Sequence, residues 1–149
     1  MLSLCSLRGI TNMERADLEK ILPHRKPMLL VDEADINVDG NAVGRYTVQG
    51  DEFFLQGHFP GNPVVPGVIL CEMIAQTCAV LLSVNSEGKT PYYTSLDKVR
   101  FKHVVKPGDT IEFLCEIIKM KPPFYFARGK GIVSGKRCIE GEFSFALID

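Results

Sequence analysis

One apolar segment, residues 67–84, constrains the fold of this 149-residue chain more than any other feature. Its large hydrophobic side chains fall on almost every side of a helix, and such a helix must be wrapped by other structure. The segment approaches the length of a membrane span, but Glu72 and Gln76 interrupt it. We therefore expect the buried central helix of a soluble domain, with no membrane span.

The segments on either side of this helix indicate what wraps it. Before it, the patterns predict a short helix at 14–22, strands at 28–36 and 42–49, and a long loop at 50–66. After it, turn signals separate four predicted strands, at 92–105, 110–120, 124–133 and 137–148. Strands joined by short turns form antiparallel meanders, and one such sheet curled around one helix buries every apolar face. The sequence thus predicts an α+β fold.

The chain reads as a single domain, residues 1–149, which is long enough for a core of its own. Thr11 with Glu14 resembles a capping box at the start of the first helix, and residues 1–13 read as a loosely held extension. The extension lacks a basic start, a long apolar core and a clear cleavage site, so we expect no secretory signal.

The five cysteines are odd in number and include no C-x-x-C pair, which favours reduced, buried thiols in a cytoplasmic protein. They are Cys5, Cys71, Cys78, Cys115 and Cys138. The spacings of histidine, cysteine and acidic residues form no recognisable metal-binding set.

The charge of the chain argues against one class of partner and permits another. A net charge of −1 argues against a nucleic-acid-binding protein. Residues 1–75 carry six basic against ten acidic residues, whereas residues 76–149 carry eleven against eight, giving nets of −4 and +3. The basic half permits an acidic partner, although a solvated strand face with Lys and Arg on it explains the same excess.

Two residues of the loop and the central helix suggest acid–base chemistry. His58 lies in a loop rich in glycine and proline, and Glu72 follows fourteen residues later within the apolar helix. Histidine moves protons near neutral pH, and a buried acid is costly unless it is paired or used. We expect the apolar surroundings to raise the pKa of Glu72. Taken alone, each residue could instead be structural, as we read His24 and His103.

Four sequence blocks resemble those of the FabZ-type β-hydroxyacyl-ACP dehydratases, in the same order. They are LPHRKPMLLVD (22–32), QGHFPGNPVVPGV (56–68), EMIAQ (72–76) and LDKVRFKHVVKPGD (96–109). The resemblance covers roughly residues 15–148, and it implies a hot-dog fold. It also implies dehydration of (3R)-3-hydroxyacyl-ACP to trans-2-enoyl-ACP in type II fatty-acid biosynthesis, without a metal or organic cofactor.

The resemblance implies a role for particular residues. His58 and Glu72 would form the catalytic pair, with His58 of one protomer facing Glu72 of its partner across a homodimer. The family commonly forms hexamers, as trimers of dimers. The substrate-binding candidates are Gly67, whose N–H would face the thioester carbonyl, Gln76 beside Glu72, and the apolar Phe59 and Val68. For Phe59, filling of the core is an equally good reading. Cys71 adjoins Glu72 but reads as a core thiol.

The resemblance also implies a partner, the acidic acyl carrier protein with its 3-hydroxyacyl-phosphopantetheine. Among the basic residues of the second half, we expect Arg100, Lys102 and Lys121 to dock it. The chain departs from the family pattern at Lys26, where an aromatic residue is common, and at Met73, where alanine is usual.

Two other functions compete with the dehydratase. A hot-dog thioesterase would use the acid to activate water, but it would leave the histidine loop without a task. A non-catalytic acyl-binding regulator would need a DNA-binding segment, and about twenty residues before the motif region are too few.

Overall fold

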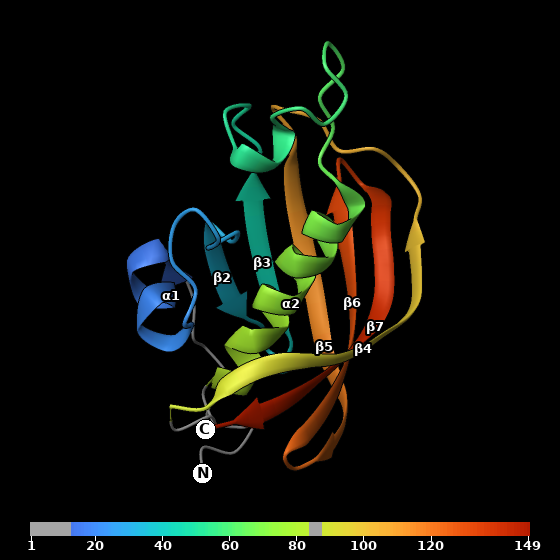
Figure 1. The fold of residues 1–149 in the computed structure, drawn as a ribbon. Coiled ribbons are helices and arrows are strands. Elements are labelled where there is room, and N and C mark those ends of the chain that lie inside the picture. Colours follow the sequence, from blue (N-terminus) through green and yellow to red (C-terminus); the bar gives the residue numbers. More distant parts are fainter. Residues whose placement is uncertain (1–12, 84–87) are drawn as a thin grey trace.

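The computed structural model describes residues 13–83 and 88–149, which form a curved sheet and one long helix (Figure 1). The elements in chain order are β1 (Met13–Glu14), α1 (Arg15–Ile21), β2 (Glu33–Ile36), β3 (Ala42–Thr47), the 3-10 helix η2 (Phe53–Leu55), α2 (Gly67–Ser83), β4 (Thr90–Phe101), β5 (Thr110–Lys121), β6 (Phe124–Val133) and β7 (Lys136–Ile148). Residues 1–12 of the expected extension, with Thr11 and Cys5, lie outside the described residues.

The strands form one seven-stranded sheet in the order β1-β2-β3-β5-β6-β7-β4, and every neighbouring pair is antiparallel. Figure 1 shows α2 against one face of this sheet, with β3, β5 and β6 behind it and β4 curling past its far end. The α+β fold predicted from the sequence is therefore confirmed.

Helix α2 is as buried as its sequence predicts, and glycines in the sheet let it approach closely. Every residue from Met73 to Leu82 is buried. A Cβ added at Gly44 would lie 2.5 Å from the Thr77 hydroxyl oxygen, and one added at Gly129 would overlap the side chain of Ile74. The helix therefore packs directly on the backbone of β3 and β6.

The predicted strand at 28–36 is wrong in its first half, because β2 begins only at Glu33. The backbone N–H of Leu30 donates to the Gln76 side chain, and the carbonyl of Met28 accepts from the same side chain. These backbone groups therefore bind the central helix rather than a neighbouring strand. The apolar run that suggested a strand is core packing, since Leu29 and Val31 are also buried.

The first helix forms where the sequence predicts it, but the expected capping box of Thr11 with Glu14 is wrong in the place it gives Glu14, because Glu14 is itself the N-cap and pairs with Asp17. Glu14 caps α1, and its backbone N–H donates to Asp17 at 3.2 Å.

Of the four cysteines in the described residues, each is buried and free, as expected: Cys71, Cys78, Cys115 and Cys138. None of the helices in the described ranges is long and apolar enough to cross a membrane.

Candidate active site

The loop that carries His58 turns sharply, because three of its residues have backbone angles in the left-handed region of φ/ψ space. Gly57, Phe59 and Gly61 have φ values of 78°, 61° and 79°. Glycine adopts this conformation freely, whereas Phe59 stores strain in it, and such strain concentrates at functional sites. Figure 1 shows the loop (residues 56–66, green) projecting beyond the end of the sheet, beside the start of α2.

The hydrogen bonds of His58 define which ring nitrogen can act as a base. Its Nδ1 lies 2.9 Å from the carbonyl oxygen of Val64. A carbonyl can only accept, so Nδ1 carries the hydrogen, and in the neutral ring Nε2 keeps its lone pair. The backbone N–H of His58 donates to Leu55, and the ring of Phe59 stacks on the imidazole with centroids 4.2 Å apart. The Nδ1 contact with Val64 thus leaves Nε2 as the ring nitrogen with a lone pair.

Glu72 lies in the second turn of α2, with 21% of its side chain exposed. Its Oε1 accepts a hydrogen bond from Gln76 at 3.0 Å and lies 3.5 Å from Nε2 of His24. The hydroxyl of Tyr93, which donates to the carbonyl of Cys71 at 3.2 Å, also lies near the carboxylate.

The expectation that burial raises the pKa of Glu72 is wrong for this environment. Burial does act to raise this pKa, but the polar groups of His24, Gln76 and Tyr93 beside the carboxylate together lower it below its ordinary value. The sequence could not show this, because Tyr93 and His24 come from segments far from Glu72 in the chain.

Gln76 is fully buried and holds three groups at once. Its amide nitrogen donates to Glu72 and to the carbonyl of Met28, and its amide oxygen accepts from Leu30. The contact with Glu72 follows from their spacing of one helical turn. Gln76 therefore joins the acid to segment 22–32, which carries His24.

Within one chain, His58 and Glu72 do not meet. In the part of the chain that the structure describes, no hydrogen bond or ion pair joins them. The start of α2 carries Gly67, where an added Cβ would lie 2.7 Å from the ring of Phe101. Val68 in the same turn is 73% exposed. Phe101, which the sequence did not single out, therefore packs against the predicted oxyanion residue.

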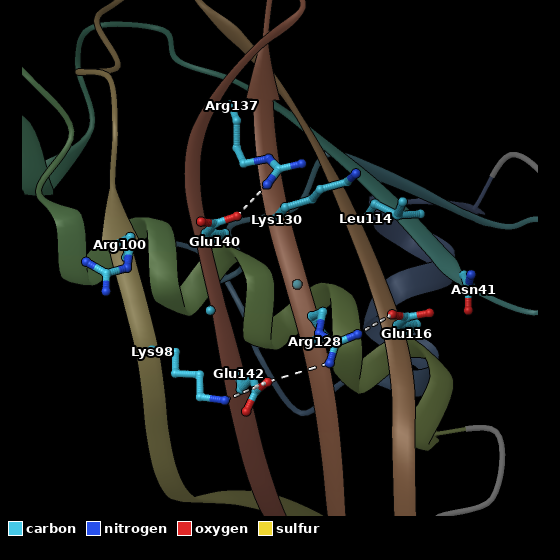
Figure 2. Close-up of a pocket in the computed structure, with 12 residues that line it drawn as sticks. Asn41, Lys98, Arg100, Leu114, Glu116, Arg128, Lys130, Arg137, Glu140 and Glu142 are labelled. Carbon is cyan, nitrogen blue, oxygen red and sulfur yellow. Dashed lines mark hydrogen bonds and ion pairs between the residues drawn. The ribbon is translucent and has the colours of Figure 1, made fainter.

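The three predicted docking residues do not form one cluster. A groove of about 440 Å³ lies on the face of the sheet opposite to α2, and Arg100 lines it (Figure 2). Among residues 13–83 and 88–149, no ion pair involves Arg100. Lys102 forms an ion pair with Glu140, with its Nζ 3.0 Å from the carboxylate Oε1. Across the sheet, Leu114 of β5 lies level with Arg100 of β4. Lys121 is the last residue of β5, seven residues beyond Leu114, so it lies roughly 23 Å further along the strand.

Comparison with known sequences gives matches over most of the chain. The profile described as a FabA-like domain matches residues 22–142. The 3-hydroxyacyl-[acyl-carrier-protein] dehydratase FabZ of Clostridium beijerinckii is 43% identical over 136 residues, covering 88% of this chain and 96% of the relative. The enzyme of the same name from Caulobacter vibrioides is 41% identical over 144 residues, covering 93% and 91%.

Comparison with solved structures confirms the hot-dog fold. The dehydratase heterocomplex ApeI:P from Xenorhabdus doucetiae matches with a TM-score of 0.77 at 19% identity, covering 89% of this chain and 91% of the other. A putative thioesterase from Ralstonia eutropha matches with a TM-score of 0.59 at 16% identity, covering 72% and 76%. At these identities the likeness concerns the fold alone.

Proposed function

The chain belongs to the FabA-like family and is a 3-hydroxyacyl-[acyl-carrier-protein] dehydratase of the FabZ type, and we propose that His58 and Glu72 carry out its acid–base chemistry. The observation that carries this proposal is the 2.9 Å contact of His58 Nδ1 with the carbonyl oxygen of Val64, which assigns the ring hydrogen to Nδ1 and leaves Nε2 as a base.

The elimination then needs one base, one acid and one site for negative charge. Nε2 of His58 removes the proton from C2, and the electron pair moves toward the thioester carbonyl. At the start of α2, the N–H groups of Gly67 and Val68 have no acceptor within the helix and can receive that charge, whereas those of Ile69 and Leu70 donate to the carbonyl of Pro66. Glu72 protonates the leaving hydroxyl at C3, so water departs and the trans-2-enoyl thioester remains. The proton on His58 returns to Glu72 through solvent.

The lowered pKa of Glu72 is compatible with this role as an acid. An acyl chain that covers the exposed part of Glu72 removes water from it, and loss of water favours the neutral carboxyl. The substrate itself would thus raise the pKa of its own proton donor. Phe59 and Val68, both strongly exposed, are placed in the proposal as apolar contacts for the acyl chain.

A homodimer would bring the catalytic pair together. Strand β4 is an edge of the sheet, and an unpaired edge offers its backbone to another strand. Large apolar side chains are exposed along it: Tyr92, Tyr93, Leu96 and Phe101. We propose that β4 is the dimer seam, that His58 of one protomer faces Glu72 of the partner subunit, and that dimers associate further into a hexamer.

The acyl carrier protein would bring the substrate. Its acidic surface complements the basic second half of the chain, and we retain Arg100, Lys102 and Lys121 as docking candidates. Because Arg100 and Lys121 lie at different levels of the sheet, charge reversal of each tests them separately. We place the enzyme in the cytoplasm, where buried thiols remain reduced.

The test is the reversible hydration of crotonyl-ACP, followed by the absorbance of the enoyl thioester. The protein should lower this absorbance, and His58→Ala and Glu72→Gln should each reduce kcat by about 10²- to 10⁴-fold. Full activity in either variant would contradict the assignment of the pair. Release of free thiol without a change of the enoyl signal would identify a thioesterase instead.

A further inference from the structure

We propose that His24 is a positioning residue for Glu72, holding one carboxylate oxygen so that the other faces the substrate. Both Nε2 of His24 and the amide nitrogen of Gln76 contact the same atom, Oε1. Among the described residues, no hydrogen bond from either of them to Oε2 is present. The inference rests on the proposed function, since it concerns the acid that serves the elimination.

The position of His24 is set by a tether from the central helix. Segment 22–32 is bound at Met28 and Leu30 by Gln76, which lies one turn from Glu72 on the same helix. The segment is held again at Asp32, whose carboxylate accepts from Thr47 at 2.7 Å and from Arg15 at 2.8 Å. The first half is held as well, because the guanidinium of Arg25 donates to the carbonyls of Leu22 at 2.9 Å and of His24 at 2.7 Å.

The two nitrogens of His24 differ in a way that fixes the function of the ring. Nε2 lies 3.5 Å from Glu72, whereas Nδ1 is buried and has no hydrogen-bond partner among the described residues. A buried polar atom without a partner is a cost to the folded protein. The contact with Glu72 is the polar interaction that the ring gains in return. A ring that served only as packing could be replaced by an apolar one at a gain in stability.

Glu72 is also contacted by groups on other elements, and the experiment must separate them. Gln76 and Cys71 lie on α2 itself, His24 comes from segment 22–32, and Tyr93 comes from β4. His24 and Gln76 both lower the pKa of Glu72, and so does Tyr93. Tyr93→Phe therefore serves as a control for a hydroxyl contact, and His103→Ala for loss of an exposed histidine away from the site.

The experiment compares two amides that reach different positions of the lost ring. Glutamine places its amide where Nε2 stood and asparagine where Nδ1 stood, so only His24→Gln keeps a donor for Oε1. We expect His24→Ala and His24→Asn to lower kcat by about tenfold to a hundredfold with little change in KM, because the acid is misplaced and the substrate contacts remain. His24→Gln should stay within a few-fold of the unmodified enzyme.

A second readout does not depend on activity. The ¹³C chemical shift of the Glu72 side-chain carboxyl, assigned by its loss in Glu72→Gln, reports its titration directly. The pKa of Glu72 should rise in His24→Ala and His24→Asn and remain near that of the unmodified protein in His24→Gln.

Each outcome bears on one proposal. Equal kcat in all three variants, or equal loss in all three, would overturn the positioning role of Nε2. An unchanged titration of Glu72 in His24→Ala would overturn it as well. An unmodified protein that titrates as expected but does not hydrate crotonyl-ACP would leave the contact intact and contradict the proposed function.

Discussion

The amide oxygen of Gln76 accepts a hydrogen bond from the backbone N–H of Leu30 at 2.8 Å, although 46 residues separate the two in the chain. The same side chain also binds the carbonyl of Met28 and the carboxylate of Glu72. One buried amide thus satisfies the backbone of an irregular segment and orients the proposed acid. Stability and chemistry are therefore coupled at this residue.

Replacing Gln76 by methionine should cost about 3 kcal/mol of unfolding free energy, because it leaves the Leu30 N–H and the Met28 carbonyl buried without partners. Urea denaturation at neutral pH measures this cost. Gln56→Met, at an exposed position, is the matched control and should change stability by less than about 0.5 kcal/mol. Equal stability of the two variants would show that the tether does not matter.

Glu52 should stabilise the fold in a pH-dependent manner. Burial acts to raise its pKa, but N–H groups of Gln49 and Gly50 and the hydroxyl of Tyr46 donate to the carboxylate and lower the pKa overall. A folded pKa below the unfolded one gives stability that is present above the unfolded value, near 4.5, and is lost as the pH falls through the folded value.

The urea midpoint of Glu52→Gln should therefore lie below that of the unmodified protein at pH 7, and the difference should shrink as the pH falls below 4.5. Glu19, exposed on α1, supplies the control variant Glu19→Gln. A difference for Glu52→Gln that is the same at pH 7 and at pH 3.5 would contradict this account.

A charge on the β4 edge should separate the proposed dimer. Leu96 is 48% exposed on this strand, and a lysine there would have to be buried at a strand-to-strand seam. Leu96→Lys should give a folded monomer by sedimentation, with activity lost. Val38→Lys, at a position 76% exposed in the turn between β2 and β3, should leave both assembly and activity unchanged. A fully dimeric Leu96→Lys protein would place the seam elsewhere.

The sequence predicted the elements whose patterns are local. The apolar circumference of α2 and the turns between β5, β6 and β7 needed no knowledge of distant residues, and their bounds agree closely with the structure. The strand expected at 92–105 is less accurate, because β4 runs from Thr90 to Phe101. The segment at 28–32 was misread because an apolar run looks alike in a buried strand and in irregular core structure. The hydrogen bond that joins this segment to Gln76 is evident only from the folded structure, because the two lie far apart in the chain.

The candidate site was predictable in its residue types and less so in its electrostatics. His58 and Glu72 stand out from the sequence because a loop histidine and an acid in an apolar helix are unusual. The lowered pKa of Glu72 arises from His24, Gln76 and Tyr93, and of these only Gln76 lies on the same helix as the acid. His24 had been read as a structural residue, yet the fold places it against the acid.

The most direct test of the central claim is complementation between inactive subunits. His58→Ala and Glu72→Gln proteins are purified separately, mixed in equal amounts, unfolded and refolded together, and assayed with crotonyl-ACP. If each site takes His58 from one protomer and Glu72 from its partner, random pairing makes half of the dimers mixed, and one of the two sites in each mixed dimer is intact. The mixture should then recover about a quarter of the unmodified activity. A mixture as inactive as either parent would show that both residues of a site come from the same chain.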